Sequence, residues 1–466
     1  MEYYGITFDV NNRPELDPEF IPLQKFNKAF LESATVPFSF ALERNDKQIA
    51  VISTKIHGDE EYREADMYYA ERLVKTILWQ KGGFRLYVKG DDFIYQMLKK
   101  AYSIDGIRAF DAKLMSEMYR HDFEVIKSDS LPEQCEQRKS IGGHFDGCRI
   151  GFDAGGSDYK VSAVIDGEAV YSKETVWHPK ENSDPDYHFQ GILDAFRDAM
   201  GHLPRVDAIG ISSAGIFANN YLLLAQLFQK VPRELFDTKV RNIYIRAVKK
   251  IGDGIPFEVA NDGDVTALTG SIGMSRNNIL GIAMGTSVAG GFVDTEGSIS
   301  GWLNEIAFMP VDGSPLAVKD DWSGDTGVAV HYFCQEAVIK LSGPAGISLD
   351  GFPTPAKKLE EVQSLLLKGH EGAGSIFRTI GAYLGHSAPL YNDIYGADAI
   401  LLLGRVMSGE GGNIIVKTAN AVLRDEYPDL SIDLLLPDEK TRRMGQSVIA
   451  ASLPKRSISE ENNANR

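Results

Sequence analysis

Apolar residues follow two periods along the chain, and together they predict a mixed α/β protein. Short apolar runs that end in glycine or polar residues predict strands beyond residue 146. These runs lie at 148–156, 160–166, 168–177, 206–213, 257–260, 279–285, 290–294, 399–404 and 431–436. Helical spacing recurs between them, as in Phe189, Ile192, Leu193, Phe196 and Met200. Strands that alternate with helices are typical of α/β folds with largely buried sheets.

The N-terminal part has its own mixed pattern. Apolar runs on both sides of Asn45-Asp46 predict two strands, and helical spacing from Glu64 to Gln80 predicts a helix that stops at Gly82-Gly83. A further strand is expected at 84–90. Three roles stay open for this part: capping a ligand site, mediating dimerisation, or serving as a degenerate second half.

The pattern predicts several structural parts. A strand, a glycine turn and a second strand occur twice, around Gly155 and around Gly285, which predicts two lobes. The expected parts are an N-terminal α/β extension (1–145), lobe I (146–265, completed by a C-terminal helix at about 438–453), lobe II (266–437) and a polar tail (454–466).

Charge and cysteine content narrow the function classes. The formal net charge of −16 disfavours nucleic acid and anionic membranes as partners, and the N-terminal part is itself net acidic. Cys135, Cys148 and Cys334 lie far apart, which favours a reducing compartment and disfavours structural zinc or an iron–sulfur cluster. Without a signal-peptide pattern or an apolar run of about 20 residues, we expect a cytoplasmic protein.

Two glycine turns are candidates for binding phosphate. Asp153-Ala154-Gly155-Gly156-Ser157 joins two predicted strands, and glycines let backbone N–H groups approach phosphate oxygens. Asp153 precedes the turn, where a carboxylate could hold Mg²⁺ directly or through water. Gly285-Thr286-Ser287 offers a second turn. An ordinary hairpin turn remains the alternative for each, and the pairing of two such turns favours a nucleotide held between the lobes.

Two further motifs follow predicted strands. Asp262, in Asn261-Asp262-Gly263, could take the proton from an attacking hydroxyl, although Asn-Asp-Gly is also good turn and helix-cap chemistry. Gly404-Arg405 keeps the backbone clear of side chains and could admit a flat adenine ring. A plain strand-to-helix loop remains the alternative there.

In this order and spacing, the motifs resemble those of the ROK (repressor, open reading frame, kinase) family of sugar kinases, within the hexokinase–actin superfamily. The resemblance covers roughly 146 to 453. The motifs are DAGGSDYK from Asp153, GISSAG from Gly210, VANDGDVTALTGS around Asp262, GTSVAGG from Gly285, and Gly404-Arg405. The resemblance implies a two-lobed actin-like ATPase (ribonuclease H-like) fold with an additional N-terminal α/β domain.

The resemblance also implies residue roles. Asp262 would be the catalytic base, and Asn261 and Glu305 would bind the sugar. ATP would be bound by Gly155, Gly156, Ser157, Lys160, Gly285, Thr286, Ser287, Gly404 and Arg405. Asp153 would hold Mg²⁺ through ATP. A homodimer is implied only by the family.

Two departures from the family pattern concern the sugar end. The family's Gly-Glu-Ile-Gly-His is here Asn304-Glu305-Ile306-Ala307-Phe308, so that Phe308 occupies the position of a histidine that binds sugar and zinc. The cysteine-rich zinc motif is absent, and an insertion-like stretch, VDGSPLAVKDDWSGDTG, follows. Its Asp320, Asp321 and Asp325 could replace the lost hydrogen-bond partner, with a solvated acidic loop as the alternative.

The expected function is ATP-dependent phosphoryl transfer to a hydroxyl of a sugar or sugar-like substrate. Asp262 would deprotonate that hydroxyl, and closure of the lobes would exclude water. A catalytically idle sugar sensor on the same fold is the main alternative. A transcriptional repressor of this family would need a basic helix-turn-helix. Another ATPase of the superfamily, such as an acyl-phosphate-forming kinase or a reductase activator, is a further alternative, and the activators use clustered cysteines.

Overall fold

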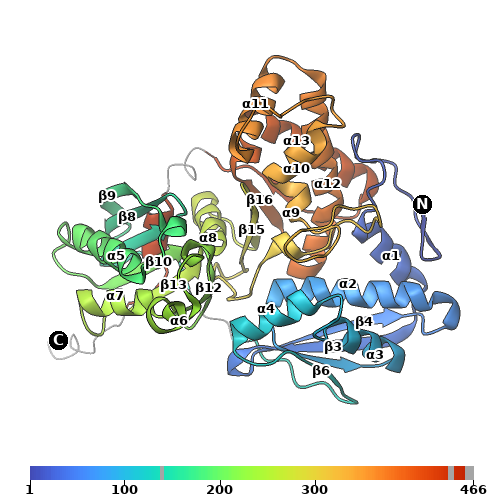
Figure 1. The fold of residues 1–466 in the computed structure, drawn as a ribbon, viewed down its shortest axis with the longest axis horizontal. Coiled ribbons are helices and arrows are strands. Elements are labelled where there is room, and N and C mark those ends of the chain that lie inside the picture. The colour runs from blue at the N-terminus through green and yellow to red at the C-terminus, as the bar shows by residue number, and fades with distance from the viewer. Residues whose placement is uncertain (137–140, 439–444, 457–466) are drawn as a thin grey trace. The chain divides into compact units, whose positions relative to one another are not determined.

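The protein is described here by a computed structural model that covers residues 1–136, 141–438 and 445–456. The chain divides into two compact units (Figure 1). Unit 1 comprises Met1–Gln137, Ile282–Gly290 and Trp302–Leu436, and unit 2 comprises Arg138–Gly281, Gly291–Gly301 and Pro437–Arg466. The boundary passes through the strands β14 (Ile279–Met284) and β15 (Val288–Val293). The domain boundaries expected at 145, 265 and 437 remain predictions.

Unit 2 is built on a five-stranded sheet with the order β13-β10-β7-β8-β9. The strands are β7 (Cys148–Ala154), β8 (Asp158–Ile165), β9 (Glu168–Val176), β10 (Ala208–Ser213) and β13 (Phe257–Asn261). β13, β10 and β7 run parallel, whereas β8 is antiparallel to both β7 and β9. Asp166 and Gly167 join β8 to β9 with φ of 48° and 87°, the positive values that a type I′ hairpin turn requires.

Helices cover both faces of this sheet. Among its described residues, the unit also contains a short hairpin and these α-helices: β11 (Ile216–Ala218), β12 (Tyr221–Leu224), α5 (Pro185–Met200), α6 (Arg233–Leu235), α7 (Ile243–Ile251), α8 (Asp262–Met274) and α15 (Gln446–Ala451). Apolar residues of α5 and α7 share a buried cluster with Phe152 and Ile211. α15 packs on the opposite face, where a Cβ at Gly210 would lie only 2.5 Å from the carbonyl carbon of Ala450. Residues 439–444 of the expected C-terminal helix lie outside the described residues.

A second sheet repeats this strand order. Its order is β15-β14-β16-β17, so these strands take the positions that β8, β7, β10 and β13 have in the first sheet. β16 (Ala399–Leu403) and β17 (Asp433–Leu435) run parallel. The accompanying helices are α9 (Val330–Phe333), α10 (Gln335–Ser342), α11 (Pro355–Leu367), α12 (Glu371–Tyr395) and α13 (Gly409–Glu426). The repeated order agrees with the predicted duplication.

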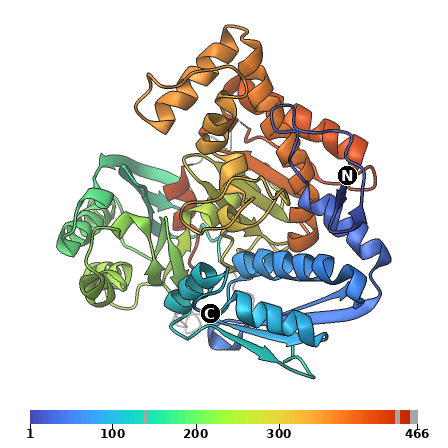
Figure 2. The same ribbon diagram turned by 45° about the vertical axis from the view of Figure 1, so that its right-hand side comes forward.

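The N-terminal block of unit 1, drawn in blue to cyan in Figure 2, carries a four-stranded sheet with the order β4-β3-β5-β6. Its elements are β1 (Glu2–Tyr3), β2 (Ile6–Thr7), α1 (Leu23–Ser33), β3 (Val36–Glu43), β4 (Ile49–Ile56), α2 (Arg63–Lys81), β5 (Arg85–Lys89), α3 (Asp92–Ala101), α4 (Ala109–Tyr119) and β6 (Glu124–Lys127). The strand pair, the helix and the next strand expected here are confirmed. β5 is antiparallel to β3, whereas β10 is parallel to β7. The block is therefore not a third copy of the lobe sheet.

α2 is buried more completely than an amphipathic helix requires. Its apolar residues Ala70, Val74 and Ile77 are buried as expected, but Arg72 and Lys75 are buried as well. This observation predicts that polar partners surround the helix.

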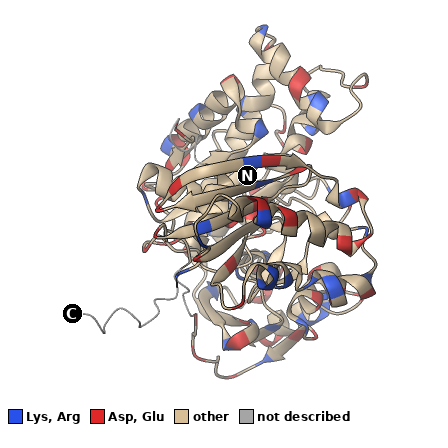
Figure 3. Ribbon diagram, turned by 90° about the vertical axis from the view of Figure 1, so that its left-hand side faces the viewer, with Lys and Arg blue, Asp and Glu red and all other residues tan. Residues whose placement is uncertain are grey.

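The rest of the described chain adds two general observations. Among all the residues that the structure describes, no helix is both long and apolar enough to cross a membrane. Acidic and basic residues are interspersed along the elements visible in Figure 3.

Candidate functional site

Three parallel strands of unit 2 end beside one another and carry most of its predicted site residues. In the strand register, Ala154 of β7 lies beside Ser213 of β10, which lies beside Asn261 of β13. Because the carboxyl ends of parallel strands meet at one edge of the sheet, the turn after β7 and the start of α8 lie at the same edge. Asp153 and Asp262 are thereby brought together.

Asp153 is a buried carboxylate at this edge. Its Oδ1 accepts a hydrogen bond of 2.7 Å from the Ser212 hydroxyl. Burial raises the pKa of Asp153 to about 6, and the negative charge of Asp262 adds to this, against the opposing effects of Ser212 and Lys160. Ser212 was not singled out by its sequence motif.

The turn after Asp153 has the form expected of a hairpin, but it leaves amides available. The Gly155 amide donates to the Asp158 carbonyl (3.0 Å), and Trp177 Nε1 donates to the Gly155 carbonyl (2.8 Å). Among the described residues, no acceptor takes the amides of Gly156 and Ser157. Both amides are therefore available to an anion.

Two lysines accompany this turn. Lys160 lies opposite Asp153 in the β7–β8 register, and its Nζ is 3.7 Å from an Asp158 carboxylate oxygen. Lys180, which sequence patterns did not suggest, lies against Gly156: a Cβ there would be 3.4 Å from its Nζ. Lys180 comes from a short 3-10 helix (Pro179–Glu181) beyond β9, so only the folded chain reveals that it lies beside the turn.

Asn261 and Asp262 begin α8. Asn261 is its N-cap: Oδ1 accepts from the Gly263 amide (2.7 Å), and Nδ2 donates to the Gly215 carbonyl (2.7 Å). The helix-cap reading of this motif is therefore correct for Asn261. Asp262 also accepts from the Gly263 amide (3.0 Å), yet burial outweighs that bond and raises its pKa. A raised pKa moves a carboxylate toward the range suited to a general base.

In unit 1 the turn predicted to bind phosphate, at Gly285, lies beside the predicted adenosine motif. Gly404 follows β16 with φ of 97°, and a Cβ there would lie 2.6 Å from the carbonyl carbon of Met284. Met284 is the last residue of β14 and directly precedes Gly285, whose carbonyl accepts from the Gln335 amide at the start of α10 (3.0 Å). Thr286, Ser287 and Arg405 are exposed there.

Phe308, in the position of the family's histidine, belongs to an aromatic cluster. Its ring centroid is 4.4 Å from Trp79, 5.8 Å from Phe110 and 5.3 Å from Trp322. Trp79 and Phe110 come from α2 and α4 of the N-terminal block. This block therefore packs against the segment that carries Glu305.

The insertion-like stretch is not the solvated acidic loop that its sequence suggested. Asp320 and Asp325 are buried, and Asp321 is exposed. Asp320 accepts from the amide and the hydroxyl of Ser323 (both 2.6 Å), whereas Asp325 pairs with Arg72, Lys75 and Arg108. The solvated-loop expectation is therefore wrong for two of the three aspartates: the N-terminal block supplies the cations around Asp325, whereas Asp320 is held by Ser323 and His331.

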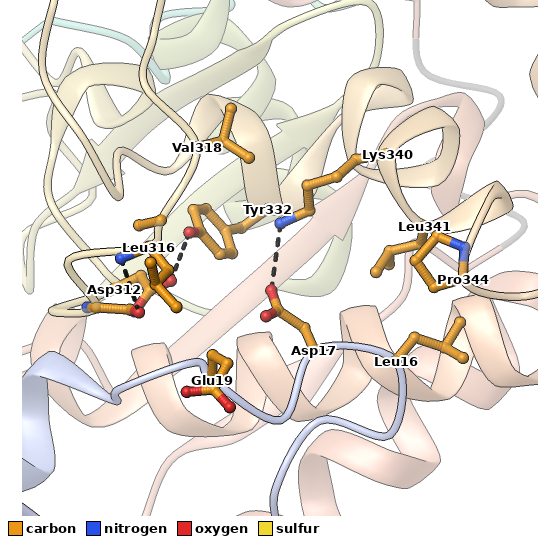
Figure 4. Close-up of a pocket in the computed structure, with 12 residues that line it drawn as sticks. Leu16, Asp17, Glu19, Asp312, Leu316, Val318, Tyr332, Lys340, Leu341 and Pro344 are labelled. Carbon is orange, nitrogen blue, oxygen red and sulfur yellow. Dashed lines mark hydrogen bonds and ion pairs between the residues drawn. The ribbon is translucent and has the colours of Figure 1, made fainter.

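A separate pocket in unit 1 lies among residues that were not predicted as site residues (Figure 4). This cavity of about 160 Å³ is bordered by the N-terminal segment, through Leu16, Asp17 and Glu19, and by α10. Tyr332 donates to Asp312 (2.6 Å) and Lys340 to Asp17 (3.5 Å). Because these groups already pair with one another, we interpret the pocket as a contact of the N-terminal segment and not as the functional site.

Asp153 fits the role of a ligand to Mg²⁺ that is bound through ATP. A carboxylate is a donor that Mg²⁺ prefers, and the ionised form of this one is disfavoured by burial and by Asp262. A nearby cation would therefore stabilise it. No cluster of three or more His, Cys, Asp or Glu residues in the described ranges could hold a metal ion, so phosphate oxygens would have to supply further ligands.

No model of a known protein family matches the sequence, and no curated protein matches it either. Solved structures do match. A ROK-family transcriptional regulator, a homologue of the E. coli MLC protein, matches at 17% identity and a TM-score of 0.51, over 66% of this chain and 79% of that chain. The ROK hexokinase from Thermus thermophilus matches at 17% identity and a TM-score of 0.50, over 66% of this chain and 97% of that chain.

These likenesses concern the fold. Together with the two sheets of repeated order, they confirm the predicted fold class. About two-thirds of the chain has the actin-like ATPase fold of ROK proteins, and the remaining third is additional to it.

Proposed function

We propose that this protein transfers a phosphoryl group from ATP to a hydroxyl of a sugar or sugar-like substrate. The observation that carries the proposal is the pair of carboxylates at one sheet edge of unit 2. Burial raises the pKa of both Asp153 and Asp262, and Asp262 begins a helix beside a glycine turn with available amides. A metal ligand and a general base beside a phosphate-binding turn are the parts that phosphoryl transfer needs.

In unit 2 we propose groups that bind phosphate, a metal ligand and a general base. The amides of Gly156 and Ser157 bind phosphate oxygens, with Lys160 as a further cation, and Gly155 keeps the turn tight. Asp153 would hold Mg²⁺, and the bound ion would neutralise phosphate charge. Asp262 orients the acceptor hydroxyl and takes its proton, and Asn261 fixes the helix start while it helps to bind the acceptor.

For unit 1, taken by itself, we propose the following roles. Gly285, Thr286 and Ser287 bind phosphate oxygens through their exposed turn, and Gly404 and Arg405 form the wall beside adenine. Glu305 binds acceptor hydroxyls. Since Phe308 has no hydrogen-bonding atom in its side chain, the acceptor loses the partner that a histidine would offer.

The test is a coupled ADP-release assay with Mg²⁺-ATP and a panel of hexoses, amino sugars, polyols and sugar acids. We expect one acceptor to raise ADP release above the ATP-only background. If no acceptor raises ADP release above that background, the proposal is refuted, whether or not ATP or an acceptor stabilises the protein against heat.

A catalytically idle sugar sensor is the second candidate. The aromatic cluster around Phe308 favours it, because that cluster replaces a polar group at the acceptor end. One of the matching folds also belongs to a transcriptional regulator. The sensor predicts thermal stabilisation by one of the same sugars without ADP release. The cytoplasmic location and the homodimer remain predictions.

A further inference from the structure

The C-terminal turn of α2 is capped by the segment that carries Glu305. The last carbonyls of a helix lack partners within the helix and need external donors. Here the Glu305 amide donates to the Trp79 carbonyl (3.1 Å), and the Asn304 amide donates to the Gln80 carbonyl (3.0 Å). Two amides of the predicted acceptor segment thus take the place of water or a side-chain cap.

The same segment is held from its other sides. Asn304 has φ of 52°, a left-handed value that is uncommon for a residue other than glycine. The Tyr395 hydroxyl donates to Asn304 Oδ1 (3.2 Å). β15 approaches closely, since a Cβ at Gly290 would be 2.8 Å from the Asn304 carbonyl oxygen. These contacts hold a strained conformation at the residue before Glu305.

The Trp79 side chain is itself fixed within the N-terminal block. Its Nε1 donates to Asp111 (3.1 Å), and Asp111 pairs with the fully buried Lys75 (3.1 Å). The face of Trp79 meets Phe308, three residues beyond Glu305. α2 therefore contacts this segment through both its backbone carbonyls and a side chain that is locked in place.

We propose that α2 of the N-terminal block positions Glu305, so that binding of the acceptor depends on this block while binding of ATP does not. The proposal rests on the proposed function, because Glu305 acts on the acceptor there. If α2 positions Glu305, the N-terminal block contributes to binding of the acceptor and is not a functionally separate domain. Trp79, Asn304 and Tyr395 are positioning residues that act through Glu305.

A matched pair of variants in the full chain tests the kinetic consequence. Tyr395→Phe removes the hydroxyl that binds Asn304, whereas Tyr391→Phe removes a buried hydroxyl on the same helix that has no partner among the described residues. We expect Tyr395→Phe to raise the acceptor KM about five- to tenfold with the ATP KM unchanged, and Tyr391→Phe to change neither. Asn304→Gly, which tolerates the left-handed backbone, should match Tyr395→Phe, and the double variant should be no worse than either single one.

Amide hydrogen exchange over residues 302–309 provides a readout that needs no activity. We expect faster exchange of the Asn304 and Glu305 amides in Tyr395→Phe than in Tyr391→Phe. Equal exchange in the two variants would overturn the inference, as would faster exchange with an unchanged acceptor KM. If the wild type releases no ADP with any acceptor, the proposed function fails separately, and the exchange comparison still decides whether this contact network holds the segment.

Discussion

The ammonium of Lys75 lies 2.9 Å from the carboxylate of Asp325, and both side chains are almost completely buried. They belong to a group of six buried charges that balance each other: Arg72, Lys75 and Arg108 against Glu71, Asp111 and Asp325. Burial by itself would raise the pKa of Asp325, but the charges of Arg72 and Lys75 outweigh it and lower the pKa. This group joins the N-terminal block to the insertion-like stretch.

Removing one member of the group should leave an uncompensated buried charge. We expect Asp325→Ala to lower the free energy of unfolding by about 3–5 kcal/mol. Asp321→Ala, on the exposed side of the same stretch, should change it by less than about 0.5 kcal/mol. Urea denaturation of both variants measures the difference, and equal stability would show that Asp325 is not held as described.

Asp262→Asn should separate binding from catalysis. The amide can still accept from the Gly263 amide but cannot take a proton, so ADP release should fall by about 10²–10⁴-fold. Thermal stabilisation by Mg²⁺-ATP and by the acceptor should persist. Asp253→Asn, on an exposed turn, serves as the control and should keep full turnover. Full turnover in Asp262→Asn would remove this residue from the role of base.

Asp153→Asn should stabilise the protein while it impairs metal-dependent binding. The folded-state pKa of about 6 lies above the ordinary 3.8, so ionisation of Asp153 costs stability as the pH rises through about 6. At about pH 7.5 this cost is about 3 kcal/mol, and below about pH 3.8 it vanishes. The variant should therefore exceed the wild type in free energy of unfolding above about pH 6 and lose this advantage as the pH falls toward 3.8.

The Asp153→Asn variant also tests the proposed role of Asp153 in binding the metal. Mg²⁺-ATP should raise the melting temperature of the wild type and have little effect on Asp153→Asn. A variant no more stable than the wild type at about pH 7.5 would contradict the account of its pKa. A variant still stabilised by Mg²⁺-ATP would remove Asp153 from the metal.

Gly404→Ala should disrupt the contact between the second phosphate motif and the adenosine motif. Its Cβ would meet backbone atoms of Met284, including the amide nitrogen at 2.8 Å, and its φ of 97° suits glycine. We expect a loss of about 3 kcal/mol or more in stability and weaker binding of ATP. Gly409→Ala, with φ of 64° and no atom within 4 Å of its Cβ, should cost only about 1–2 kcal/mol. Calorimetric titration with a non-hydrolysable ATP analogue would measure the binding.

The local pattern of the chain was sufficient for the strands of the two lobe sheets, for α2 and α5, and for three strands of the N-terminal block, but it did not predict β6, β11, β12, α1, α3 or α4. The strand pair around Asn45-Asp46, the helix α2 and the Asp166-Gly167 turn are all confirmed, because backbone preferences and apolar periods act over a few residues. The order of the motifs also led to the fold class. Asp153 and Asp262 could be named because Asp153 lies near the end of one apolar strand, Asp262 directly follows another, and parallel strands end at one edge.

Contacts between distant parts of the chain were decided only by the tertiary structure. Arg72 and Asp325 are 253 residues apart, and no local pattern shows that they pair. An aspartate in a polar stretch resembles a solvated residue until the buried cations of another segment surround it. The amides of Asn304 and Glu305 cap α2 for the same reason: the sequence shows where a helix ends, but the partner of its last carbonyls depends on which segment the fold brings there.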